Sequence, residues 1–116
     1  MAELTIYHNP RCSKSRQTLA LLEERGIAPT IVEYLKDTPD AATIKSLLVK
    51  LGVDAREMMR RKEEAYAAND LGRDDLSEED LIAAMIAHPI LIERPIVEAG
   101  ERAIIGRPPE NVLELL

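Results

Sequence analysis

The chain is poor in cysteine, with a single one among its 116 residues. One cysteine cannot build an internal disulfide framework or a multi-cysteine zinc site, and we expect neither a metal nor a bound cofactor. The apolar residues come in short groups broken by charges, so no run approaches the ~20 residues of a membrane-spanning helix. The first residues carry no basic start followed by a long apolar stretch, so no secretion signal is recognised. We therefore expect a cytoplasmic protein with no membrane partner.

Positive charge is also scarce. The chain has 15 Lys and Arg against 21 Asp and Glu, a formal charge of −6. Nucleic-acid surfaces depend on clustered positive charge, so we expect no nucleic-acid partner. Apolar residues make up 46% of the chain, which is enough for one core at this length. These properties predict a single globular domain over residues 1–116.

The first third of the chain has the pattern of a β-α-β unit. Residues 4–7 are β-forming, and an Asn-Pro turn signal follows them. A helix is expected from Ser13, and Gly26 should end it because glycine tolerates the left-handed conformation at a helix end. Residues 30–35 form the densest β-forming run of the protein. With a helix between them, the two strands should lie parallel in one sheet.

The rest of the chain adds a helical insertion and a return to the sheet. Helical periodicity and capping signals dominate the insertion, at about 40–88, where Ser77 and Asp80 have the spacing of a capping box. Strands are expected over 95–97 and 102–105, followed by a final helix that begins at Pro108. This order predicts an α/β protein with a mixed four-stranded sheet, the layout of the thioredoxin-like fold.

Cys12 stands where the first strand passes into the first helix. The unpaired amides and positive dipole end of that helix favour a thiolate, and Arg11, Lys14 and Arg16 add positive charge to the same loop. A buried, inert cysteine is the alternative, but the polar neighbours favour an exposed, reactive one. Cys12-Ser13-Lys14-Ser15 lacks a second cysteine and Thr18 replaces the arginine of a phosphatase-type loop. Cys12 therefore needs an external thiol to recycle it.

Three further arginines stand at structural transitions, where they are candidates for binding an oxyanion. Arg60 ends a short predicted helix, and Arg94 and Arg107 each precede a proline. A guanidinium can hold two oxygens at once and stays charged. A solvated surface charge is the alternative for each arginine, and the sequence alone does not bring the three together.

Three blocks of the sequence resemble the glutaredoxin-coupled arsenate reductase family, and the chain, which ends at Leu116, is similar to its short form. The blocks are residues 7–16 (YHNPRCSKSR), 88–97 (HPILIERPIV) and 106–110 (GRPPE). The resemblance implies a thioredoxin-like fold with a helical insertion. It further implies reduction of arsenate to arsenite in the service of arsenic detoxification, with glutathione as co-substrate and glutaredoxin as partner.

The resemblance also assigns roles to residues. It implies that Cys12 attacks arsenate, that His8 assists thiolate formation and that Ser15 hydrogen-bonds the sulfur. Pro95 is implied to follow a cis peptide bond. The remaining implied role is oxyanion binding, by Arg60, Arg94 and Arg107.

Two other functions remain open. One is a glutathione-dependent monothiol oxidoreductase that acts on an unknown oxidised substrate. The other is a non-catalytic binding protein like the Spx-type regulators, although these usually carry a C-x-x-C motif and Ser15 occupies the second cysteine position here. Turnover of arsenate with glutathione and glutaredoxin separates an arsenate reductase from both.

Overall fold

The computed structural model describes residues 4–93 and 95–116. The chain divides into two compact units, one formed by residues 1–37 and 94–116 and the other by residues 38–93. We call them the sheet unit and the helical unit. The helical unit contains the insertion expected at about 40–88, while the expected single domain over 1–116 stays a prediction. In the part of the chain that the structure describes, no helix has the length and apolarity to cross a membrane.

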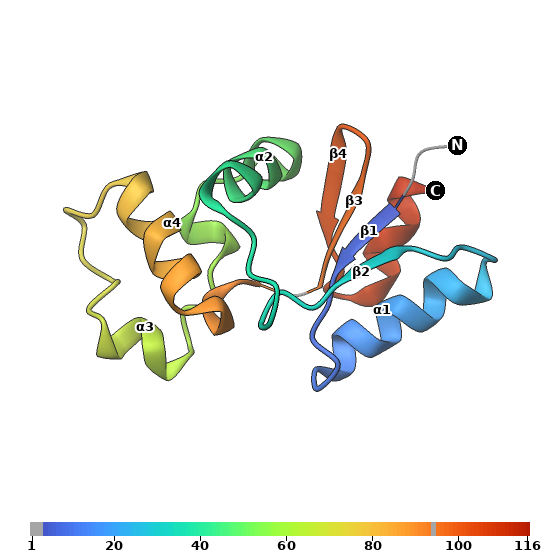
Figure 1. Ribbon diagram of the computed structural model, residues 1–116, viewed down its shortest axis with the longest axis horizontal. Coiled ribbons are helices and arrows are strands. Elements are labelled where there is room, and N and C mark those ends of the chain that lie inside the picture. Colours follow the sequence, from blue (N-terminus) through green and yellow to red (C-terminus); the bar gives the residue numbers. More distant parts are fainter. Residues whose placement is uncertain (1–3, 94) are drawn as a thin grey trace. The chain divides into compact units, whose positions relative to one another are not determined.

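The sheet unit is built on four strands in the order β2-β1-β3-β4 (Figure 1). Strand β1 pairs in parallel with β2 and antiparallel with β3, and β3 pairs antiparallel with β4. The predicted mixed four-stranded sheet of a thioredoxin-like fold is therefore confirmed. The elements of this unit are β1 (Leu4–Tyr7), α1 (Ser13–Glu24), β2 (Thr30–Val32), β3 (Ile96–Ala99), β4 (Arg102–Ile105) and the 3-10 helix η3 (Pro109–Leu115).

One face of this sheet carries a small hydrophobic core. Ile6 of β1 lies opposite Val97 of β3, and both are fully buried. Leu22 of α1 and Val112 of η3 pack against them. Burying one such side chain contributes roughly 1.5–3 kcal/mol, so the core holds α1 and η3 firmly against the sheet. The loop at residues 8–12 is thereby fixed between the end of β1 and the start of α1.

The helical unit consists of two longer helices and three short helical segments. Helix α2 begins after Asp40, whose side chain accepts a hydrogen bond from Thr43 N at 2.8 Å, and ends at Gly52 in the left-handed conformation. The capping box predicted for Ser77 and Asp80 is confirmed at the start of α4. The elements are α2 (Ala41–Leu51), η1 (Arg56–Met58), α3 (Glu64–Ala68), α4 (Glu78–Ala87) and η2 (Pro89–Leu91).

Within the helical unit, residues 58–60 run antiparallel to residues 91–93. Met59 and Ile92 form an isolated bridge, and both are buried. Arg60 N donates to Leu91 O at 2.7 Å, and Glu93 N donates to Met58 O at 2.8 Å. Because both flanking hydrogen bonds are made, the backbone of Arg60 is well anchored in this unit.

Two expected elements differ in the structure. The strand expected over 30–35 ends at Val32, because the chain turns there, with Lys36 N donating to Glu33 O at 2.9 Å. The final segment is a 3-10 helix instead of an α-helix. Its start is held by an i+3 hydrogen bond, in which Asn111 N donates to Pro108 O at 3.0 Å. A segment of seven residues is short, and an i+3 hydrogen bond can form one residue earlier than an i+4 bond, which favours the 3-10 form in short pieces.

Candidate active site

Cys12 is the residue that caps the N-terminus of α1. Its backbone is extended, with φ −93° and ψ 123°. Cys12 N donates to Asn9 O at 3.0 Å, and Cys12 O accepts from Arg16 N at 3.0 Å. The first amides of a helix have no acceptor within it and carry the positive end of its dipole. The sulfur thus lies where a negative charge is stabilised.

The thiol of Cys12 is more enclosed than its polar neighbours predict. Arg11 and Lys14 are exposed, as expected, but Cys12 is only 8% exposed. The prediction of an exposed cysteine is therefore wrong. Cys12 is enclosed because a tight turn, closed by the hydrogen bond from Cys12 N to Asn9 O, folds the cysteine inward. The long side chains on either side of it point outward. Enclosure strengthens electrostatic interactions at the sulfur because less water screens them.

Arg107 reaches the sulfur of Cys12 from the other end of the chain. Its Nη2 lies 3.6 Å from Cys12 Sγ, although the two residues are 95 positions apart. The arginine follows β4, and its backbone is fixed by a hydrogen bond from Arg107 N to Ile105 O at 2.9 Å. A guanidinium at this distance stabilises a thiolate and can donate to an oxyanion bound beside it.

His8 and Ser15 form a buried polar pair next to the cysteine. His8 Nδ1 lies 2.6 Å from Ser15 Oγ, which also accepts from Asn9 N at 3.1 Å. Burial lowers the pKa of His8, with Glu33 opposing and Arg16 reinforcing the shift. The shift favours the neutral imidazole of His8. The hydrogen bond expected between Ser15 and the cysteine sulfur stays a prediction.

The loop around Cys12 is positively charged in an otherwise acidic chain. Residues 8–18 include Arg11, Lys14 and Arg16 and no acidic residue, whereas the whole chain carries −6. Arg16 also closes the loop, because its Nη1 donates to Pro10 O at 2.8 Å. This local excess of positive charge attracts anions to the cysteine.

The structure does not relate the other two expected oxyanion ligands, Arg60 and Arg94, to Cys12. Arg60 belongs to the helical unit, where its Nε lies 3.4 Å from Glu63 Oε1. Its buried Nη1 makes no hydrogen bond to the described residues. Arg94 lies outside the described residues, and so does the peptide bond expected to be cis before Pro95. A cis peptide bond joins Arg107 to Pro108. Convergence of the three arginines stays a prediction.

Three residues near the site were missed by reasoning from the sequence. Asn9 is buried, and its Oδ1 accepts from Arg11 N at 3.0 Å, which shapes the loop. Thr18 is fully buried on α1 and lies against Gly106. The glycine directly before an Arg-Pro pair was a usable signal, since glycine commonly marks a close backbone approach. Nothing in the sequence alone pairs it with Thr18.

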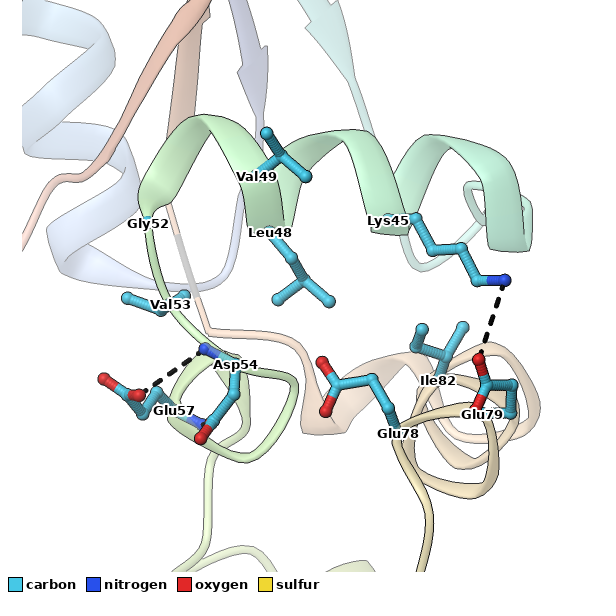
Figure 2. Close-up of a pocket in the computed structure, with 10 residues that line it drawn as sticks. All are labelled: Lys45, Leu48, Val49, Gly52, Val53, Asp54, Glu57, Glu78, Glu79 and Ile82. Atoms are coloured by element: carbon cyan, nitrogen blue, oxygen red, sulfur yellow. Dashed lines mark hydrogen bonds and ion pairs between the residues drawn. The ribbon is translucent and has the colours of Figure 1, made fainter.

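A groove in the helical unit has the wrong charge for an anion. It has a volume of about 680 Å³, and Figure 2 shows acidic side chains along it. Several are already engaged: Glu78 accepts from Ala55 N at 2.8 Å, and Glu79 pairs with Lys45 at 3.9 Å. Among the described residues, no cluster of three metal-ligating side chains occurs. The candidate site for an oxyanion is therefore the Cys12 loop. The groove is lined by Lys45, Leu48, Val49, Gly52, Val53, Asp54, Glu57, Glu78, Glu79 and Ile82.

Comparison with known proteins gives matches along nearly the whole chain. The model of the ArsC family matches residues 7–115. The uncharacterized protein YfgD of Escherichia coli K12 is 56% identical over 115 residues, covering 98% of this chain and 97% of that protein. A protein of Haemophilus influenzae named arsenate reductase is 54% identical over 112 residues, covering 96% and 97%. A solved structure, named arsenate reductase from Vibrio cholerae, is 53% identical with a TM-score of 0.97, covering 99% and 98%.

Proposed function

The chain belongs to the ArsC family, and we propose that it is an enzyme that reduces arsenate to arsenite through the thiolate of Cys12. Relatives at about half identity that cover nearly the whole chain are named arsenate reductase. The observation that carries the proposal is the guanidinium of Arg107 at 3.6 Å from the cysteine sulfur, at the N-terminus of a helix. This arrangement provides a nucleophile and a binding group for an oxyanion in one place.

The charges around the site suit a tetrahedral oxyanion. Arsenate carries negative charge on several oxygens, which need donors from more than one direction. Arg107 provides one planar donor group beside the sulfur. In our proposal Arg94 and Arg60 complete the binding of arsenate.

The proposed reaction begins with substitution at arsenic. The Cys12 thiolate attacks arsenate, a sulfur–arsenic bond forms, and one oxygen leaves as water after protonation. Glutathione then displaces a second oxygen in the same way. A thiolate of glutaredoxin attacks the glutathione sulfur and forms a disulfide with it, so the electron pair of that sulfur–arsenic bond stays on arsenic and reduces it from the +5 to the +3 state. Hydrolysis of the remaining bond releases arsenite and regenerates Cys12.

The need for external thiols follows from the cysteine count. The reaction consumes two electrons, supplied when two thiols become one disulfide. Cys12 is the single cysteine of the chain, so no second cysteine of the chain can form a disulfide with it. We therefore propose glutathione as co-substrate and glutaredoxin as the protein partner that completes the cycle.

His8 and Ser15 support the nucleophile in this proposal. A neutral imidazole can take the thiol proton of Cys12, either directly or through the hydroxyl of Ser15. The 2.6 Å contact between His8 Nδ1 and Ser15 Oγ holds the ring in place. The role of the pair is thus to form and orient the thiolate.

Arsenate turnover by the purified chain tests the proposed function. With arsenate, glutathione and glutaredoxin supplied, we expect arsenite to form over many turnovers, and leaving out glutathione should stop it. Cys12→Ser should abolish turnover. Arg25→Gln is the matched control for arginine variants in the site, because Arg25 is an exposed residue at the far end of α1.

The same assay separates the alternatives. A chain that exchanges disulfides with glutathione at Cys12 but leaves arsenate unreduced is a monothiol oxidoreductase of another substrate. A chain that does neither is a binding protein on the same fold. Either result contradicts the proposed function.

A further inference from the structure

Gly106, the residue before Arg107, is in close contact with Thr18 of α1. Gly106 is buried and precedes Arg107, while Thr18 is fully buried on α1, the helix that Cys12 caps. The contact therefore joins the two segments that carry the candidate nucleophile and its guanidinium. Both residues belong to the sheet unit.

The contact leaves no room for a side chain at position 106. A Cβ on Gly106 would lie 2.8 Å from Thr18 Oγ1, 3.2 Å from Thr18 Cγ2 and 3.0 Å from Pro95 Cγ. The first of these distances is closer than real Cβ atoms approach other atoms. The φ of Gly106 lies outside the left-handed region, so an alanine would be acceptable to the backbone. Glycine is thus required here by space and not by conformation.

Thr18 and Gly106 are each held in place by a further hydrogen bond. Thr18 Oγ1 donates to Lys14 O at 2.8 Å and lies 3.5 Å from Gly106 O. On the other side, Gly106 N donates to Pro95 O at 2.9 Å. Because Thr18 is held within α1 by its hydrogen bond to Lys14 O, we expect an added methyl group to push the 106–107 segment away from the helix, at the cost of the hydrogen bond from Gly106 N to Pro95 O.

Movement of that segment changes the site directly. Arg107 Nη2 is already at 3.6 Å from the sulfur, near the limit for a hydrogen bond to sulfur. A further displacement of roughly 1 Å would break it and weaken the attraction between the guanidinium and the thiolate.

We propose that Gly106 and Thr18 are positioning residues whose close contact sets the distance between Arg107 and Cys12. The inference rests on the proposed function, in which Arg107 stabilises the thiolate and binds arsenate. It assigns to the glycine before the Arg-Pro pair, and to a threonine on α1, a role in the site without contact with substrate.

The test uses the full chain and the pH dependence of Cys12 alkylation by iodoacetamide. Gly106→Ala should raise the midpoint pH by about 0.5–1 unit, a loss of roughly 3–10-fold in thiolate at a pH below the midpoint. It should also raise KM for arsenate by about 5–10-fold with a smaller change in kcat. Gly72→Ala is the matched control. A Cβ there meets only Tyr66 Cε1 at 3.7 Å, an ordinary contact, and the midpoint should not move.

A double variant separates positioning from general damage to the fold. Thr18→Ala removes both Thr18 atoms that the new methyl group would strike and leaves only the looser contact with Pro95 Cγ at 3.0 Å. The midpoint pH of Thr18→Ala/Gly106→Ala should therefore return to within about 0.3 unit of that of Thr18→Ala alone, which is about twofold in thiolate. An unchanged midpoint in Gly106→Ala overturns the proposal, and so does a double variant as impaired as Gly106→Ala.

Two further outcomes are also decisive. If Gly106→Ala does not fold, recovery of a folded chain in the double variant supports the contact, and failure of both variants overturns it. If the wild-type chain does not reduce arsenate, the proposed function fails, but the alkylation measurement still decides the present inference because it needs no arsenate.

Discussion

Nδ1 of His8 lies 2.6 Å from Oγ of Ser15, and both residues are buried beside the start of α1. His8 directly follows β1, and its backbone N donates to Val32 O at 2.8 Å, while Ser15 belongs to the first turn of the helix. The pair therefore ties the end of the central strand β1 to the segment that carries Cys12. It explains how a short loop can hold a cysteine at a fixed place.

Removal of the Ser15 hydroxyl should destabilise the chain. Ser15→Ala leaves His8 Nδ1 and Asn9 N without their hydrogen bonds to that oxygen. An unsatisfied buried polar group costs about 1–3 kcal/mol, so the free energy of unfolding should fall by that amount in urea titrations at pH 7.5. Ser13→Ala is the control, because Ser13 is exposed on the same helix. Equal stability of the two variants would contradict the importance of the pair.

The lowered pKa of His8 predicts a loss of stability in acid. Burial lowers it in the folded chain, so between this lowered value and about 6.5 the unfolded chain binds more protons than the folded one. The stabilisation is present above about pH 6.5 and is lost as the pH falls towards the lowered value. The free energy of unfolding of wild type, measured from pH 7.5 to 5, should therefore decrease more than that of His8→Gln. Parallel curves for wild type and His8→Gln would exclude the predicted effect.

Arg107 should control both the thiolate and the affinity for arsenate. Arg107→Gln removes the positive charge 3.6 Å from the sulfur, so the alkylation midpoint of Cys12 should rise. Arg107→Lys keeps the charge but loses the planar pair of donors, so the midpoint should change less while kcat/KM for arsenate falls by roughly tenfold or more. Arg25→Gln should match wild type in both measurements. If Arg107→Lys equals wild type in kcat/KM, charge alone explains the role of the arginine.

Much of this arrangement is predictable from local sequence. Gly26 and Gly52 end their helices, Ser77 and Asp80 form the capping box, and each β-forming run overlaps one of the strands. Each of these features depends on neighbours within a few positions, which a sequence pattern records. Cys12 at the end of a strand and the start of a helix is a feature of the same kind.

What the sequence does not reveal depends on distant partners. Arg107 meets Cys12 across 95 positions, and Thr18 lies against Gly106 across 88. Such contacts are set by the packing of α1 and η3 on the sheet, and no local pattern encodes the distance between them.

Gly52 allows the effect of backbone conformation to be tested by itself, because an added side chain there would meet no other atom. Its φ is 71°, and a Cβ there would have no atom within 4 Å. Gly52→Ala should therefore destabilise the helical unit by about 1–2 kcal/mol, purely through the left-handed backbone. Urea unfolding followed by far-UV circular dichroism measures the loss. Gly72→Ala, where no positive φ occurs, should unfold like wild type. Equal stability of both variants would contradict the account.

The central claim, that the sulfur of Cys12 bonds to arsenic and is freed only by external thiols, is tested most directly by the mass of the intact chain. Incubation with arsenate and glutathione, without glutaredoxin, should give a chain with an added mass that maps to Cys12, and glutaredoxin should remove that mass while arsenite appears. Cys12→Ser should gain no mass and form no arsenite. Arsenite formed at an equal rate by Cys12→Ser, or by a chain whose Cys12 has first been alkylated, would contradict the claim.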